Sequence, residues 1–234
     1  DTLLENGAIS QQQHTLLMDT QESKTKPENA MTWLGDFRFR HDWQGFDKDA
    51  DPKKVDRNRE RLRARFGFAS DINDVAKIGI QLATGTDDPI STNQTLEDRF
   101  SSKSLILDLA YAEHAFFDKH LNVVVGKFKN PFVTEDGLVF DADLRFEGLA
   151  VQGQMTNGVF INAGVFPLDE SSSDNADPFM GGAQAGYTLT RKDQLKATAA
   201  VGYYSYRDVE KIDPVAYSSN SETEFKVVNP TLNI

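Results

Sequence analysis

The stretch that decides the fold is an alternating run at residues 57–68, which reads Arg57-Asn58-Arg59-Glu60-Arg61-Leu62-Arg63-Ala64-Arg65-Phe66-Gly67-Phe68. In an extended strand, successive side chains point to opposite faces. The arginines of this run would then share one face, and the apolar side chains would share the other. As a helix, the run would spread its arginines over all sides and have almost no apolar stripe. We interpret it as a strand and keep the helix, which its high helix propensity allows, as the alternative.

The same period of two recurs along the chain from Trp33 onward. Each run sets an apolar face against a polar or small one, which is the pattern of a strand with one apolar side. In the run at 104–111, we expect Leu105, Leu107, Leu109 and Tyr111 on one face, whereas the phase of the run at 121–128 is ambiguous. Nine runs lie at 33–40, 57–68, 76–82, 104–111, 121–128, 148–155, 159–166, 183–189 and 195–203, and 224–229 begins a tenth.

The connections between these runs alternate strictly between long and short. The short ones, such as 70–74 and 156–158, contain the Asn, Asp and Gly residues of tight turns. Outer-membrane barrels sort their loops in this way, with short turns on the periplasmic side and long loops outside. The sequence therefore predicts an all-β fold, a transmembrane antiparallel up-and-down β-barrel. The alternative is a soluble all-β fold, whose strands would alternate in the same manner.

Composition excludes several other classes of protein. The 234 residues carry a net charge of -11, which disfavours nucleic acid as the main partner. Cysteine is absent and only four histidines occur, so we expect no metal site. No nucleophile has a neighbouring base, and no phosphate loop or nucleotide fingerprint appears, so we expect neither an enzyme nor a cofactor. The segment 47–52 begins like a calcium loop, but Pro52 stands where glycine is required, which indicates a solvated loop.

Residues 1–30 differ from the rest of the chain because they are rich in Gln, Thr and Ser. Gly7 and Ser10 are typical of a helix end and a helix cap, so we expect short helices or a frayed tail there, followed by a linker at 19–30. The barrel would occupy 31–234. The start at Asp1 fits an exported protein that has lost its signal, or a trimmed chain. The segment preceding the first strand would lie in the periplasm.

The arginines of 57–68 and those of the preceding run predict a charged wall inside the barrel. Arg38 and Arg40 have the parity of the polar face, and hairpin neighbours lie side by side. Glu60 or loop carboxylates would offset the repulsion, and a charged ladder in a pore selects ions of the opposite sign, here anions. The expected pore-lining residues are Arg38, Arg40, Arg57, Arg59, Arg61, Arg63, Arg65, Lys77 and Lys127.

The connection at 129–147 is far more apolar than the other long loops. Such a loop on a cell surface would expose an apolar patch. We expect it to fold inside the barrel, to narrow the pore and to turn its acids toward the arginines; the alternative is packing on the barrel rim or a neighbouring subunit. Its expected constriction residues are Phe132, Glu135, Asp136, Phe140, Asp141, Asp143 and Arg145.

Several of these segments together resemble the bacterial "putative porin" family. The resemblance rests on residues 61–68, 79–85, 107–112, 125–132 and 138–149, and on Leu3 to Ser10, which looks like that family's short periplasmic segment. It implies a passive diffusion channel in the outer membrane of a Gram-negative bacterium, in which the loop after the fifth strand enters the pore. The implied partners are membrane lipid and lipopolysaccharide, small hydrophilic or anionic solutes, and further copies in a homotrimer. A soluble or surface binding module, or an adhesin, is the alternative function.

The chain departs from the family at its C-terminal end. Family members are longer, and bacterial barrels end in a strand with a terminal aromatic residue, whereas this chain ends in Asn229-Pro230-Thr231-Leu232-Asn233-Ile234. Nine complete strands do not match the even strand number of these barrels. We expect the chain to be the N-terminal part of a barrel of about 16 strands.

Overall fold

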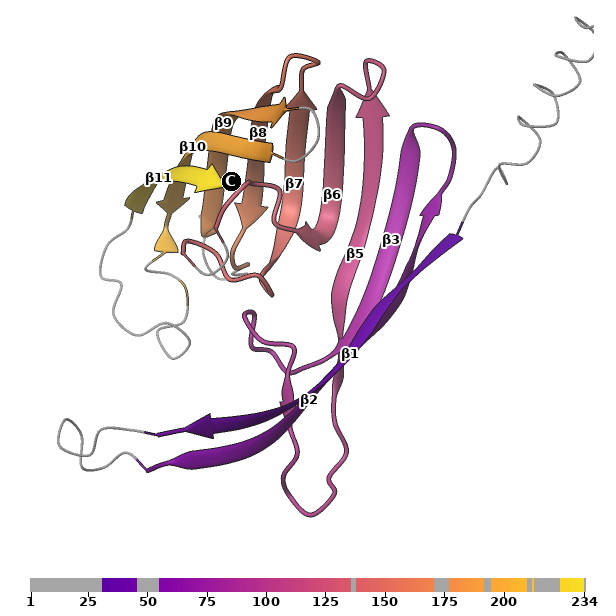
Figure 1. Ribbon diagram of the computed structural model, residues 1–234, viewed down its shortest axis with the longest axis vertical. Coiled ribbons are helices and arrows are strands. Elements are labelled where there is room, and N and C mark those ends of the chain that lie inside the picture. The colour runs from indigo at the N-terminus through magenta and orange to yellow at the C-terminus, as the bar shows by residue number, and fades with distance from the viewer. Residues whose placement is uncertain are drawn as a thin grey trace, which may run out of the picture.

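The protein forms one curved antiparallel sheet in a computed structural model, which describes residues 31–45, 55–135, 138–170, 177–191, 195–209, 212 and 224–233 (Figure 1). The predicted N-terminal segment and the calcium-like loop lie outside these residues. The strands are β1 (Met31–Gln44), β2 (Arg57–Asp71), β3 (Ala76–Thr84), β4 (Gln94–Thr95), β5 (Leu105–Phe116), β6 (Leu121–Lys129), β7 (Arg145–Gln154), β8 (Val159–Pro167), β9 (Phe179–Arg191), β10 (Leu195–Arg207) and β11 (Glu224–Asn233).

Neighbours in the sheet are neighbours in the chain. The order is β1-β2-β3-β5-β6-β7-β8-β9-β10-β11, and the two-residue strand β4 pairs with β2 beside this path. The structure confirms the predicted all-β, up-and-down antiparallel fold and all ten predicted strands. Within the described residues, β1 and β11 are the two edges of the sheet and do not pair with each other. Of the strands, the sequence analysis missed only β4, because two residues are too few to show an alternation.

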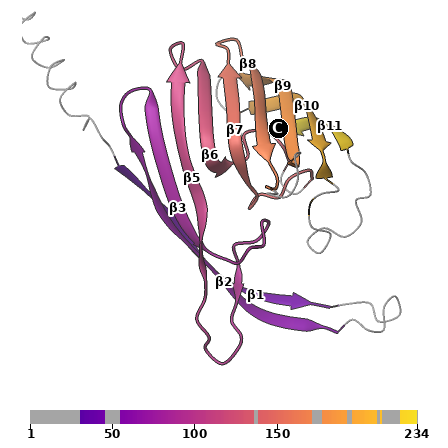
Figure 2. The same cartoon turned by 180° about the vertical axis from the view of Figure 1, so that it is seen from behind.

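Long and short connections lie at opposite ends of the sheet, as the loop lengths predicted. The short turns after β2, β5 and β7 gather at one end of the sheet, and the long connection after β3 leaves from the other (Figures 1 and 2). Asparagine side chains close the turns after β2 and β7. Asn73 Oδ1 accepts hydrogen bonds from the backbone N–H of Val75 and Ala76 at 3.0 and 2.8 Å, and Asn157 Oδ1 accepts one from Val159. These are Asx turns, which reverse the chain in few residues.

The two faces of the sheet have the inverse of a soluble protein's polarity. On one face large apolar side chains are exposed, among them Trp33 at 65% and Phe37 at 71%. On the other face the buried side chains include polar ones, among them Gln81, Asn162 and Gln184. We call the first the outer face and the second the inner face. A lipid-facing surface with a polar interior is the arrangement of a membrane barrel. No helix in the described part of the chain combines the length and apolarity of a membrane span.

An irregularity in β5 overturns one detail of the predicted alternation. The pairing of β3 with β5 shifts register between Gln81 and Leu82, so that Gln81 opposes Leu109 and Leu82 opposes Leu107. Asp108 is the extra residue, and the phase of the strand changes there. Leu105 and Leu107 are exposed on the outer face, whereas Leu109 is 2% exposed and lies inside with Tyr111. The expectation that these four residues share one face was wrong.

Candidate functional site

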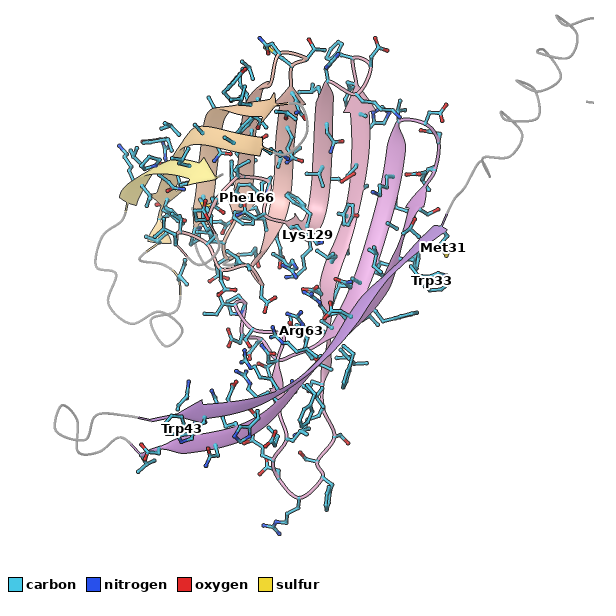
Figure 3. All side chains as sticks on the ribbon, in the orientation of Figure 1. Met31, Trp33, Trp43, Arg63, Lys129 and Phe166 are labelled. Atoms are coloured by element: carbon cyan, nitrogen blue, oxygen red, sulfur yellow. The ribbon has the colours of Figure 1, made fainter. Side chains whose placement is uncertain are left out.

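The arginines of β1 and β2 lie together on the inner face, as a wall between two carboxylates. In Figure 3, Arg63 projects toward the side where Lys129 and Phe166 lie, and Trp33 projects away from it. The register of the two strands puts acidic residues opposite arginines at both ends of the wall, and arginines opposite each other in its middle. The four cross-strand pairs are Asp36–Arg65, Arg38–Arg63, Arg40–Arg61 and Asp42–Arg59.

Two aspartates neutralise the ends of this wall. Asp36 accepts hydrogen bonds from Arg65 Nε at 2.6 Å and from Arg63 Nη2 at 3.0 Å. Asp42 forms ion pairs with Arg40 at 2.5 Å, Arg59 at 3.4 Å and Arg61 at 3.7 Å. The sequence analysis did not identify either aspartate, although both share the parity of Arg38 and Arg40 on β1. Arg57 is exposed at the start of β2, beyond these ion pairs.

Glu60, the carboxylate first expected to offset the arginines, lies on the outer face. Its Oε1 is 2.7 Å from Nδ1 of His41, which is its cross-strand neighbour. Residues 60 and 61 are adjacent in a strand, so their side chains point to opposite faces. Of the two expected sources of offsetting charge, Glu60 was therefore wrong, whereas a carboxylate of the 129–147 loop, Asp143, does contact the wall.

The loop at 130–144 packs against the inner face through aromatic side chains. Phe132 and Phe140 are 5% and 6% exposed, and each ring lies 5.0 Å from the ring of Tyr204 on β10 in an edge-to-face contact. Phe146 of β7 and Phe166 of β8 add two more rings to the cluster, which also contains Val124, Phe128, Ala150 and Met180. Edge-to-face pairs add roughly 0.5–1.5 kcal/mol each to the burial of the rings. This cluster holds the loop over strands β7 to β10.

Two inward glutamines bind the backbone of the same loop. Gln184 on β9 accepts a hydrogen bond from Val133 N at 2.8 Å and donates one to Val133 O at 2.7 Å. Gln152 on β7 donates to Pro131 O at 3.0 Å. Asn162 on β8 donates to Gln184 Oε1 at 3.2 Å and orients that amide. The sequence analysis missed these residues, although amides on the polar face of adjacent strands were visible in the alternation.

Asp143 links the loop to the arginine wall. Its Oδ1 lies 3.4 Å from Nη1 of Arg63 and 3.7 Å from Nη1 of Arg65, across 80 residues of chain in the first case. Asp141 Oδ1 accepts a hydrogen bond from Asp143 N at 2.7 Å, which shapes the turn that presents Asp143. Of the other predicted acids of this loop, Glu135 is exposed and Asp136 lies outside the described residues.

Arg145 has a different place from the one expected in the constriction. It is the first residue of β7, and its Nε donates to Asp108 Oδ1 at 3.0 Å. Their side chains are 6% and 2% exposed. Arg145 also donates to the carbonyl oxygens of Ala142 and Leu144. This buried pair fastens the end of the loop to the bulge in β5, and Asp108 had no signal in the sequence beyond its position in a strand.

The two predicted pore lysines lie on opposite faces. Lys77 lies on the inner face, in register with Asp71 and Glu113, and lines a cavity of about 390 Å³ with Tyr111 and Gln152. Lys127 lies on the outer face, opposite in parity to the buried Phe128, and forms an ion pair with Glu147. The placement of Lys127 on the inner face was therefore wrong.

A curved antiparallel sheet with an exposed apolar face, a polar inner face and long loops at one end defines a membrane β-barrel of the porin class. The family model described as "Putative porin" matches residues 50–231, and the chain belongs to this family. The family supports a location in the outer membrane. A comparison with curated proteins gave no match.

The fold is also similar to a solved porin structure, that of Pseudomonas putida OprB at high pH. The TM-score is 0.52 and the sequence identity 14%, over 90% of this chain and 62% of the OprB chain. At this identity the similarity shows the fold alone. The chain thus spans about three fifths of the length of the structure it matches.

Proposed function

We propose that the protein is an outer-membrane porin through which small hydrophilic solutes diffuse passively, with a preference for anions. The observation that carries the preference is the charge of the wall. Six inward arginines, at 38, 40, 59, 61, 63 and 65, meet three carboxylates, those of Asp36, Asp42 and Asp143. An excess of fixed positive charge on a pore wall raises the local concentration of anions.

The loop at 130–144 would narrow the path for solutes in this proposal. Its aromatic cluster, its backbone bonds to Gln184 and Gln152, and the contact of Asp143 with Arg63 hold it against the inner face at three places. A loop fixed at both ends and in its middle leaves less open area than the sheet alone. Asp143 of the loop contacts Arg63 and Arg65 directly, so the path would run beside this contact and along the remaining arginines of the wall.

The outer face and the chemistry of the side chains support the remaining parts of the proposal. The exposed apolar side chains would contact lipid and, at the long-loop end, lipopolysaccharide. Residues 1–30 would lie in the periplasm, three copies would associate in the membrane, and no reaction would be catalysed. Recovery in the soluble periplasmic fraction, rather than in outer membranes, would contradict the membrane part of the proposal.

The anion preference is tested by replacing Arg61, Arg63 and Arg65 together with serine. We expect the reversal potential across a planar bilayer, measured under a salt gradient, to shift away from the equilibrium potential of the anion. The shift should be partial, because Arg38, Arg40 and Arg59 remain, and it should shrink as salt screens the charges. Lys127→Ser is the matched control, because it removes a cation from the outer face. Equal potentials for the wild type and the triple variant at low salt would contradict the proposal.

A further inference from the structure

The middle of the arginine wall holds more guanidinium groups than carboxylates, because Arg40 and Arg61 share Asp42 and Arg38 has no carboxylate partner among the described residues. Arg38 opposes Arg63, and Arg40 opposes Arg61, in directly facing cross-strand positions. Like charges in such positions destabilise a sheet. The carboxylates that relieve the repulsion lie at the ends, at Asp36 and Asp42, or come from the loop at Asp143. The centre of the wall is thus its most electropositive part.

Arg38 is the clearest case among these residues. Within the described part of the chain it forms no ion pair, and its one hydrogen bond runs from Nη2 to Asn93 Oδ1 at 2.5 Å. Its Nε is buried without a hydrogen-bond partner, as is Nε of Arg61. A guanidinium group carries five N–H donors, so Arg38 retains donors that the protein does not use.

Neutral groups of the long connection at 85–104 orient these arginines. Arg61 Nη2 donates to Ser91 Oγ at 3.3 Å and to Asn93 O at 3.4 Å. The connection is itself held in place, because Thr84 Oγ1 donates to Thr92 O and β4 pairs with Arg61 and Leu62 of β2. Hydroxyl, amide and carbonyl oxygens fix the guanidinium groups but do not neutralise them. Asp42 is the one carboxylate that Arg40 and Arg61 share, so the three arginines keep a net positive charge in a fixed orientation, which a site for an exchangeable anion requires.

We propose that Arg38, Arg40 and Arg61 form a binding site for an oxyanion group, a phosphate or a carboxylate, on a permeating solute. The planar guanidinium fork matches the oxygens of these groups in bidentate geometry, which a spherical chloride ion does not use. The side chain of Arg40 is 41% exposed, which leaves the site open to the inner side of the sheet. The site deepens the proposed function and rests on it, because the anion must reach the wall through the channel.

The test measures chloride conductance of the reconstituted protein at low salt while inorganic phosphate is added at constant ionic strength. We expect phosphate to lower the chloride current along a saturating curve. Arg38→Gln should raise the half-blocking concentration about tenfold, the loss expected from one charge-assisted hydrogen bond. Lys77→Gln is the matched control, since it removes an inward cation that has Asp71 and Glu113 in register. It should leave the half-blocking concentration unchanged.

Arg38→Lys distinguishes the bidentate geometry of the guanidinium group from its positive charge, because lysine keeps the charge alone. It should keep the reversal potential of the wild type but lose most of the block by phosphate, because an ammonium group is a point donor. A second titration with succinate distinguishes carboxylates from phosphate as the preferred group. The native gel mobility of each variant before heating shows that it has folded.

Two results would overturn the site. One is a wild-type current that phosphate does not saturably reduce; the other is an Arg38→Gln variant that phosphate blocks as the wild type. If either result is obtained while the reversal potential still shows anion selectivity, the proposed function stands and only the oxyanion site is disproved. A channel with no anion preference removes the proposed function as well.

Discussion

Strands β1 and β2 and strands β7 to β10 share one alternating pattern but fill their inner faces in opposite ways. In β1 and β2, the inner face is guanidinium and carboxylate, and the outer face has large aromatics such as Trp33 and Phe37. In β7 to β10, the inner face is aromatic and amide, and the outer face has mainly aliphatic side chains and tyrosines, such as Ile161, Val165 and Tyr187. The difference follows what each inner face contacts. The loop at 130–144 covers the inner face of β7 to β10. The inner face of β1 and β2 instead keeps its own arginines and aspartates, most of which pair with one another.

The largest effect that would test this comparison comes from the aromatic cluster. Phe132→Ala with Phe140→Ala removes two buried rings, which costs about 3–5 kcal/mol for each in well-packed cores. We expect the loop to detach and single-channel conductance to rise. Conductance in planar bilayers is the measurement, and Phe37→Ala on the outer face is the control. An unchanged conductance in a folded double variant would mean that the loop does not narrow the path.

A smaller loss of stability is expected from breaking the two ion pairs near the C-terminal end of the loop, Asp108 with Arg145 and Asp143 with Arg63. Asp108→Ala leaves Arg145 as a buried unpaired charge, which costs about 3–5 kcal/mol. Asp143→Ala breaks contacts at 3.4 and 3.7 Å that are more open, which costs at most about 1 kcal/mol. The temperature at which the folded gel band disappears ranks the two variants. Equal temperatures would show that the Asp108–Arg145 pair is not a buried anchor.

The smallest effect is expected at the ion pair on the outer face of the arginine hairpin. His41 and Glu60 are 59% and 45% exposed, and surface pairs of this kind contribute at most about 1 kcal/mol. Glu60→Gln should therefore leave both the heat stability and the reversal potential near their wild-type values. A clear shift in reversal potential would place Glu60 beside the ion path and contradict the assignment of the two faces.

The sequence predicted most of the architecture, because alternation and loop length are direct consequences of strands that separate two environments. It predicted the arginine wall for the same reason. Among the features that it did not predict, three have a clear physical reason. The bulge at Asp108 inserts one residue where both phases are aliphatic, so the period does not reveal it. Lys127 lies in a strand whose inner side chains, Val124 and Phe128, are apolar because they belong to the core beneath the loop. The partners of that loop, Gln152 and Gln184, required the tertiary contact itself.

The contacts of the loop also imply an order of folding. Every long strand pairs with its neighbour in the chain, so the sheet can grow hairpin by hairpin with little loop-closure entropy at each step. Val133, however, binds Gln184, which lies 51 residues later in the chain. The loop therefore cannot reach its final position until β9 has been added to the sheet. An assembling sheet is consequently open along its inner face until a late step, when the docking loop covers strands β7 to β10.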